Sequence, residues 1–148
     1  MKGNAYITGC LKDVTITGEI YFNDGCHTLH FVLFNGSSRS LVFTNDFLDP
    51  RSIANYFFAV TNSVIRDSIP WARPLTEYAP GRVEVPSGGS FEHEFTLETY
   101  FLDVGEYLRA ADITVFWSIR LQPLGDPEFI VVNGYAITPQ MEVAKGKE

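Results

Sequence analysis

The segment from Asp112 to Leu121 constrains the fold more than any other part of the sequence. Apolar residues occupy every second position of this segment, and Thr, Phe, Ser and Arg stand between them. Side chains of a strand point alternately to opposite faces, so one face would carry only apolar residues. These are Ile113, Val115, Trp117, Ile119 and Leu121. The pattern predicts a central strand with Trp117 as a structural residue of the core.

Further short apolar stretches, separated by turn residues, predict that the rest of the chain is also β. The expected strands span residues 14–22, 28–34, 40–44, 56–61, 63–66, 82–85, 90–97, 128–132 and 135–138, and pairing is expected to begin near 5–11. Asn23-Asp24-Gly25 and Asn133-Gly134 predict hairpin turns, because these residue types tolerate positive φ angles. With no long helical period anywhere, we predict an all-β fold of about eight to ten short antiparallel strands, arranged as a sandwich or a barrel.

The chain is expected to form one domain over residues 1–148. Its 148 residues suffice for one hydrophobic core, and 14% of them are aromatic, which suits strands. No internal repeat or interior linker divides the sequence. Residues 1–4 and the polar tail 143–148 are expected to be flexible.

A short motif ahead of the central strand favours the sandwich over the barrel. Asp103-Val104-Gly105-Glu106-Tyr107 resembles the tyrosine corner of immunoglobulin-like β-sandwiches. The resemblance implies an immunoglobulin-like fold in which the Tyr107 hydroxyl bonds back to the turn backbone, with Asp103 and Gly105 as structural residues of the turn. Arg109 stands where antibody domains have a cysteine, so an antibody-type domain is not implied.

A broader likeness extends over residues 29–121. The segments 29–35, 81–88 and 105–107, together with Leu97 and Tyr100, are similar to two groups of sandwich proteins. One is the immunoglobulin-like region that precedes the catalytic domain of deuterolysin-type zinc proteases. The other is the group of small bacterial intracellular proteinase inhibitors. Neither group supplies catalytic residues, and the zinc-binding helix of the proteases has no counterpart in this sequence.

The two cysteines leave the compartment open. Cys10 and Cys26 lie in candidate neighbouring strands and are too close in sequence to be the inter-sheet pair of antibody domains. A disulfide between them would contribute about 3 kcal/mol on the chain-entropy model, and two small buried thiols are the alternative. No secretory signal or long apolar run is present, so no membrane span is expected. The localisation is left unknown: a cytoplasmic location is expected for the sequence as written, and a periplasmic or secreted one if a signal segment was removed.

The net charge of the chain argues against a nucleic acid as its partner. Its 18 acidic and 11 basic residues give a net charge of −7, which repels the phosphate backbone of nucleic acids. The acidity serves either solubility or the attraction of a basic protein partner.

No catalytic, metal or cofactor site is expected. His27 and His30 are three residues apart and therefore point to opposite faces of a strand, while His93 shares an apolar face with two phenylalanines. Ser37, Ser38 and Ser87 stand in hairpin turns rather than in a nucleophile elbow. We therefore expect a protein that is not an enzyme.

The proline-rich segment from Arg66 to Arg82 carries the candidate binding residues. Trp, Tyr and Arg are enriched at binding hot spots, and prolines lower the entropy lost when a loop docks. The candidates are Trp71, Arg73, Tyr78, Arg66 and Arg82. In the alternative interpretation, Trp71 folds back and closes an open edge of the sandwich.

The sequence favours a non-catalytic protein-binding β-sandwich, of which an inhibitor or an immunity-type antagonist is one form. An accessory or carbohydrate-binding module is the alternative, and it would require Trp71, Tyr78 or Tyr135 to be exposed and roughly coplanar. An uncharacterised hydrolase is the second alternative. The oligomeric state is left open.

Overall fold

The computed structural model describes residues 2–4, 9–52, 55–62, 67–72 and 81–139, and these residues form mainly antiparallel β-strands. The all-β prediction is confirmed at this level. The strands are β1 Lys2–Asn4, β2 Val14–Asn23, β3 Cys26–Asn35, β4 Leu41–Thr44, β5 Asn55–Thr61, β6 Arg82–Val85, β7 Ser90–Thr96, β8 Ile113–Leu121 and β9 Ile130–Ile137. The helices are the 3₁₀ turn η1 Gly9–Asp13 and the short α1 Leu97–Tyr100 and α2 Val104–Leu108.

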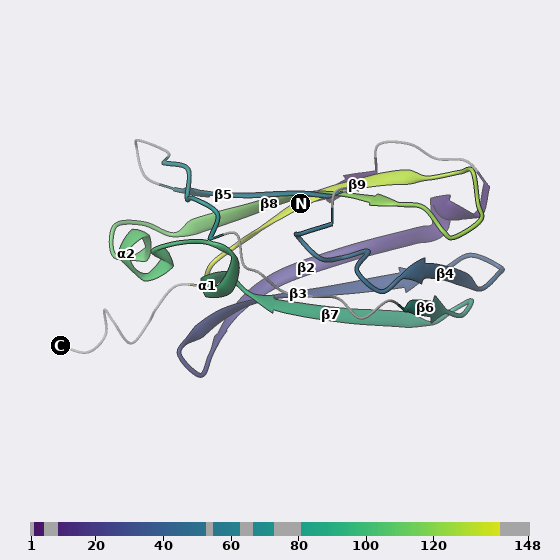
Figure 1. Cartoon of the computed structure of the whole chain (residues 1–148), viewed down its shortest axis with the longest axis horizontal. Coiled ribbons are helices and arrows are strands. Elements are labelled where there is room, and N and C mark those ends of the chain that lie inside the picture. The colour runs from purple at the N-terminus through teal and green to yellow at the C-terminus, as the bar shows by residue number, and fades with distance from the viewer. Residues whose placement is uncertain (1, 5–8, 53–54, 63–66, 73–80, 140–148) are drawn as a thin grey trace.

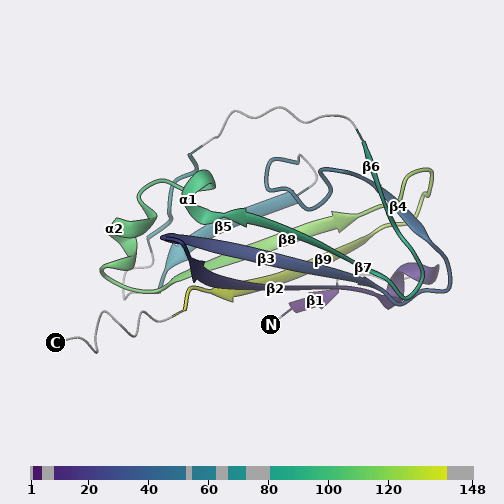
Figure 2. The ribbon, with the colours of Figure 1, turned by 90° about the horizontal axis from the view of Figure 1, so that it is seen from below.

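The strands form two facing layers (Figure 1). One sheet has the order β1-β9-β8-β5, and the other has the order β2-β3-β7. The pair β4-β6 lies at one end of the layers, and α1 and α2 lie at the other end, as the view from below also shows (Figure 2). The predicted segment 112–121 does form an inner strand, because β8 is paired on both sides, with β5 and with β9.

The core between the layers is centred on the alternating face of β8. All five apolar residues that the pattern placed on one face are buried. From β3, the ring of Phe31 meets the Trp117 indole edge-on, with ring centroids 4.9 Å apart, and it also contacts Phe57 of β5. Aromatic contacts across the two layers thus join the sheets directly, and their burial supplies the main driving force for folding.

The hairpin expected at Asn23-Asp24-Gly25 is present. Asp24 and Gly25 have positive φ angles of 52° and 80°, and Asn23 pairs with Cys26 across the turn. Two consecutive residues with positive φ match the right-handed twist of the strands that they connect. The turn therefore fixes the register of β2 and β3 along their whole length.

The hairpin expected at Asn133-Gly134 is wrong. Both residues lie inside the continuous strand β9, where Asn133 pairs with Ser118 and Gly134 pairs with Trp117. On its other side β9 pairs with β1, so Gly3 faces Asn133. Non-local pairing on both sides of β9 outweighs the local turn preference of Asn-Gly.

The N-terminal region also differs from the expectation. Residues 2–4, expected to be flexible, form strand β1 against β9. Of the expected strand 5–11, residues 5–8 lie outside the described residues, and the part from residue 9 onward belongs to the 3₁₀ turn η1. The strand expected at 63–66 and the tail 143–148 also lie outside the described residues.

Candidate binding surface

Trp71, the leading candidate of the proline-rich segment, packs against the protein itself. It is half-buried and stacks on Phe101, with centroids 4.9 Å apart and an interplanar angle of 25°. It also meets Tyr100 edge-on, and the Ala72 amide donates to the Tyr100 carbonyl over 2.8 Å. Trp71 thus folds back onto α1 and the residue that follows it, and whether it closes an edge of a sheet stays a prediction.

The other candidates of this segment do not join Trp71 in the described part of the chain. Arg66, Arg73 and Tyr78 lie outside the described residues. Arg82 is exposed at the start of β6, where it pairs with Thr44 of β4. The segment as a binding loop therefore stays a prediction.

The tyrosine-corner motif forms a short helix. Asp103 precedes α2 in the left-handed region, with φ 57°, and Tyr107 lies within the helix and packs against the core. Within the described residues the Tyr107 hydroxyl has no hydrogen bond. A Cβ at Gly105 would meet no atom within 4 Å, so packing does not require glycine there.

Two of the three histidines bind glutamates. His27 is buried, and the carboxylate of Glu98 in α1 accepts two hydrogen bonds from it, one from the backbone amide and one from Nδ1, each over 2.9 Å. His30 Nε2 lies 3.1 Å from a carboxylate oxygen of Glu92. His93 is partly buried, and burial lowers its pKa. Among the described residues, no cluster of three or more histidine, cysteine, aspartate or glutamate residues could hold a metal ion.

A buried ionic cluster joins the loop after β4 to α1. The Asp49 carboxylate is buried and accepts hydrogen bonds from Arg51 over 2.9 and 3.0 Å and from the Tyr100 hydroxyl over 3.3 Å. The Arg51 guanidinium also lies over the Tyr100 ring, 5.6 Å from its centroid. Burial and the nearby Asp49 charge raise the pKa of Tyr100. The charged groups of the cluster are paired, as a buried structural link requires.

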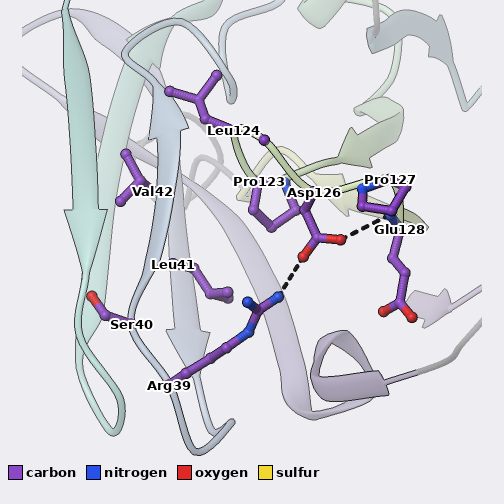
Figure 3. Close-up of a pocket in the computed structure, with 10 residues that line it drawn as sticks. Arg39, Ser40, Leu41, Val42, Pro123, Leu124, Asp126, Pro127 and Glu128 are labelled. Carbon is purple, nitrogen blue, oxygen red and sulfur yellow. Dashed lines mark hydrogen bonds and ion pairs between the residues drawn. The ribbon is translucent and has the colours of Figure 1, made fainter.

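An open pocket of about 540 Å³ lies between the start of β4 and the β8–β9 connection (Figure 3). Arg39 and Asp126 form an ion pair in it. Asp126 also accepts a hydrogen bond from the Glu128 amide over 2.9 Å. This hydrogen bond lowers the pKa of Asp126 most, and the hydrogen bond from Arg39 lowers it further. The Leu124 amide donates to the Val42 carbonyl over 2.8 Å. The polar groups of the pocket therefore bind one another, and their contacts hold the start of β4 against the β8–β9 connection.

The outer face of β5, β8 and β9 carries a row of aromatic side chains. Phe58, Phe116 and Tyr135 are directly opposite one another across the three strands. The Phe58 and Phe116 rings stack with centroids 5.1 Å apart, and Phe116 and Tyr135 are 5.9 Å apart. Together with the exposed Tyr56 and Ile137 beside them, these residues are called the aromatic face.

The aromatic face is open to solvent. Tyr56 is 74% exposed, Phe58 53% and Tyr135 38%, values that are high for side chains of this size. Of the outward-facing residues of β5, β8 and β9, all of which the structure describes, only Arg120 is charged. Its guanidinium lies 4.2 Å from the Phe129 ring centroid at the end of the face. The exposed side chains of this face are thus mainly apolar and lie next to one another.

The outer face of the β2-β3-β7 sheet has the opposite chemistry. It exposes Glu19, Glu92 and Glu94, and the Tyr21 hydroxyl donates to Glu94 over 2.6 Å. This hydrogen bond raises the pKa of Tyr21. We call these three glutamates the acidic face. Among the outward-facing strand residues of the two layers, the carboxylates thus lie on this layer alone, whereas exposed aromatic rings lie on both layers, since Phe34 of β3 is also exposed.

Comparisons with known proteins add no family to these observations. No protein-family model matches the chain, and no curated protein is similar to it. In the described part of the chain, none of the helices has the length and apolar character needed to cross a membrane.

Proposed function

We propose that the chain is a non-catalytic protein-binding module with an immunoglobulin-like β-sandwich fold, and that it binds through the aromatic face. The observation that carries the proposal is the row of Phe58, Phe116 and Tyr135 on an exposed sheet surface without carboxylates. Phe, Tyr and Arg are enriched at the cores of protein interfaces, whereas Asp and Glu are depleted there. An inhibitor or antagonist is one form that such a module takes.

The arrangement of the rings favours a protein over a sugar. A pyranose ring stacks on the free, flat side of an aromatic ring. Phe58 and Phe116 stack on each other at an interplanar angle of 21°, so each covers one side of the other. Each of these two rings therefore has at most one free side for a sugar, whereas contact with apolar side chains of a protein does not need a free, flat side.

The position of the charges bears on the kind of partner. The sequence raised a basic partner as one use of the net charge of −7. The acidic face lies on the layer opposite the aromatic face, so the carboxylates do not surround the proposed contact surface. Apolar complementarity therefore supports the proposal, and the attraction of a basic partner does not.

The fold part of the proposal is supported by two facing antiparallel sheets joined by a packed aromatic core. The Asp103–Tyr107 motif does not add to this support, because it forms the helix α2 and the hydrogen bond expected from the Tyr107 hydroxyl is not among those of the described residues. An experimental structure that shows Greek-key connections between the two sheets would test the immunoglobulin-like assignment.

Site-specific photo-cross-linking tests the binding surface. A benzophenone amino acid at position 58 should form covalent adducts with a defined protein in cells, and the adducts should disappear when Tyr56→Asp is added. The matched control places the same probe at Phe34, which is 43% exposed on the outer face of β3. Equal adducts from positions 34 and 58 would contradict the proposed surface.

A further inference from the structure

We infer that the aromatic face binds a second copy of this chain, so that two molecules associate through their β5-β8-β9 sheets. The inference rests on the proposed function, because it identifies the partner of the same surface. It is supported by where the charges lie and by the extent and the arrangement of the apolar residues.

The distribution of charge permits two copies to approach by this face. Each chain carries a net charge of −7, and like-charged chains repel one another. Among the outward-facing residues of β5, β8 and β9, Arg120 alone is charged, whereas Glu19, Glu92 and Glu94 lie on the outer face of the other sheet. When aromatic faces meet, the acidic faces become the two outermost surfaces of the pair.

The separation of the acidic faces makes their repulsion small. Sheets pack about 10 Å apart, so four stacked sheets place the two acidic faces about 30 Å from each other. Charges are screened over about 8 Å at physiological ionic strength. Contact through the acidic faces would instead bring six glutamates together, at three from each copy. Charge therefore selects the aromatic face for self-association.

The arrangement of the side chains suits a two-fold interface. In such an interface the same surface of both copies is used, so it must be complementary to itself. The central row places Phe116 in the middle, with Phe58 on one side and Tyr135 on the other. A two-fold axis that crosses the three strands at Phe116 would set each ring of the row opposite the same ring of the second copy, and it would keep the two Arg120 side chains apart. Every ring would then meet an apolar ring rather than a charge.

The extent of the face sets the strength of the association. Three strands of about eight residues, spaced about 4.8 Å apart, present about 400 Å² of flat sheet. Stable interfaces bury about 800 Å² on each partner. The face is thus about half of that size, and the expected dimer is reversible and depends on concentration.

Sedimentation velocity of the full chain tests the inference. The wild-type chain should shift from the monomer towards the dimer as its concentration rises from about 1 µM to about 500 µM, a range suited to a reversible complex. Phe58→Asp should abolish the shift, because a carboxylate would be buried without a partner. Phe34→Asp changes another exposed phenylalanine, which lies on the other sheet, and should leave the shift unchanged.

Two further measurements keep the result unambiguous. Tyr56→Asp changes the most exposed residue of the face and should also abolish the shift, while circular dichroism confirms that each variant is folded. Raising the salt concentration should preserve or strengthen the dimer, since its contact is apolar. Loss of the dimer in high salt, or an unchanged dimer in Phe58→Asp, would overturn the assignment.

The outcomes separate this inference from the proposed function. A wild-type chain that stays monomeric over the whole range overturns the second-copy inference. Adducts formed at position 58 with a different protein would then still support the proposed function. If position 58 forms no adducts beyond those of position 34 and the chain is monomeric, both are wrong.

Discussion

Gly134 lies directly opposite Trp117 in the β8–β9 ladder, and the indole of Trp117 covers the place that a side chain would take. A Cβ at Gly134 would lie 2.7 Å from Cζ2 of the indole, closer than real Cβ contacts come. From the other sheet, Gly18 makes a similar approach, with 2.8 Å between its Cβ position and Cη2. The largest core side chain is thus accommodated by two glycines, one from each layer.

Gly134→Ala should therefore lower the stability of the protein. The added methyl group must displace the buried indole, and overpacking of this kind costs about 1–3 kcal/mol. Chemical denaturation measures the loss. Gly105→Ala is the matched control, because its Cβ would meet no atom within 4 Å and it lies in the helix α2, where alanine is preferred. If both variants lost equal stability, the packing argument would fail.

Glu98→Ala should destabilise the joint between α1 and the β2–β3 hairpin. The Glu98 carboxylate accepts hydrogen bonds from the backbone amide and from Nδ1 of His27. Removing the carboxylate leaves these two buried groups without a partner. Such a loss costs about 1–3 kcal/mol. Glu98→Gln keeps an acceptor for the amide and should lose less. Urea denaturation of both variants checks this order, whereas a purely electrostatic role predicts equal losses because both variants remove the charge.

Trp71→Ala should lower stability and leave binding by the aromatic face unchanged. The Trp71 ring stacks on Phe101 and contacts Tyr100, and its half-buried surface is worth about 2 kcal/mol. Trp71→Phe, which keeps an aromatic ring there, should retain most of the stability. Melting temperature and the cross-linking yield at position 58 report on the two properties separately. A loss of binding without a loss of stability would restore Trp71 as a binding residue.

The strands whose evidence is local were predictable from the sequence. The alternation in β8 and the Asn23-Asp24-Gly25 turn each involve only neighbouring residues, and both were predicted correctly. The course of β9 was not, because its Asn-Gly pair is held straight by partners far away in sequence. Local turn chemistry carries no information about those partners.

The aromatic face was missed for a related reason. Phe58, Phe116 and Tyr135 belong to three strands, and only the register brings them into one row. The sequence of β8 did contain a sign of this surface. Phe116 is apolar, yet it alternates with the buried residues and so points to the outer face of the sheet. An aromatic residue out of phase with its own strand can indicate a second, functional surface. The sequence instead drew attention to Trp71, whose partners Tyr100 and Phe101 are also distant in sequence.

The two cysteines should both be free thiols. Cys26 is a free, half-buried thiol and the first residue of β3, so it lies beside the last residue of β2 at the hairpin turn. Cys10 lies in η1, which precedes the first residue of β2 and is therefore at the opposite end of that strand. The ten residues of β2 span about 33 Å, far more than the 7 Å that a disulfide allows between Cα atoms. Intact mass after alkylation without reductant should show two modified thiols. A mass lower by two hydrogens and unmodified by the reagent would contradict the placement of η1.

Acidification should weaken the fold through His93, whose ring lies near Asp49, Arg51 and Glu94. Burial lowers the pKa of His93 in the folded protein, and the nearby carboxylates only partly oppose this effect. Below about pH 6.5, the ordinary value for histidine, the unfolded chain therefore binds more protons than the folded one, so stability falls as the pH falls. His93→Gln cannot take up that proton and should flatten the decline in melting temperature between about pH 7 and pH 5.

Asp126 does not affect stability in this pH range. Its pKa is also lowered, but the loss of stability that this causes begins only near the ordinary aspartate value of about 3.9. An unchanged slope in His93→Gln would show that the proton uptake belongs to another group.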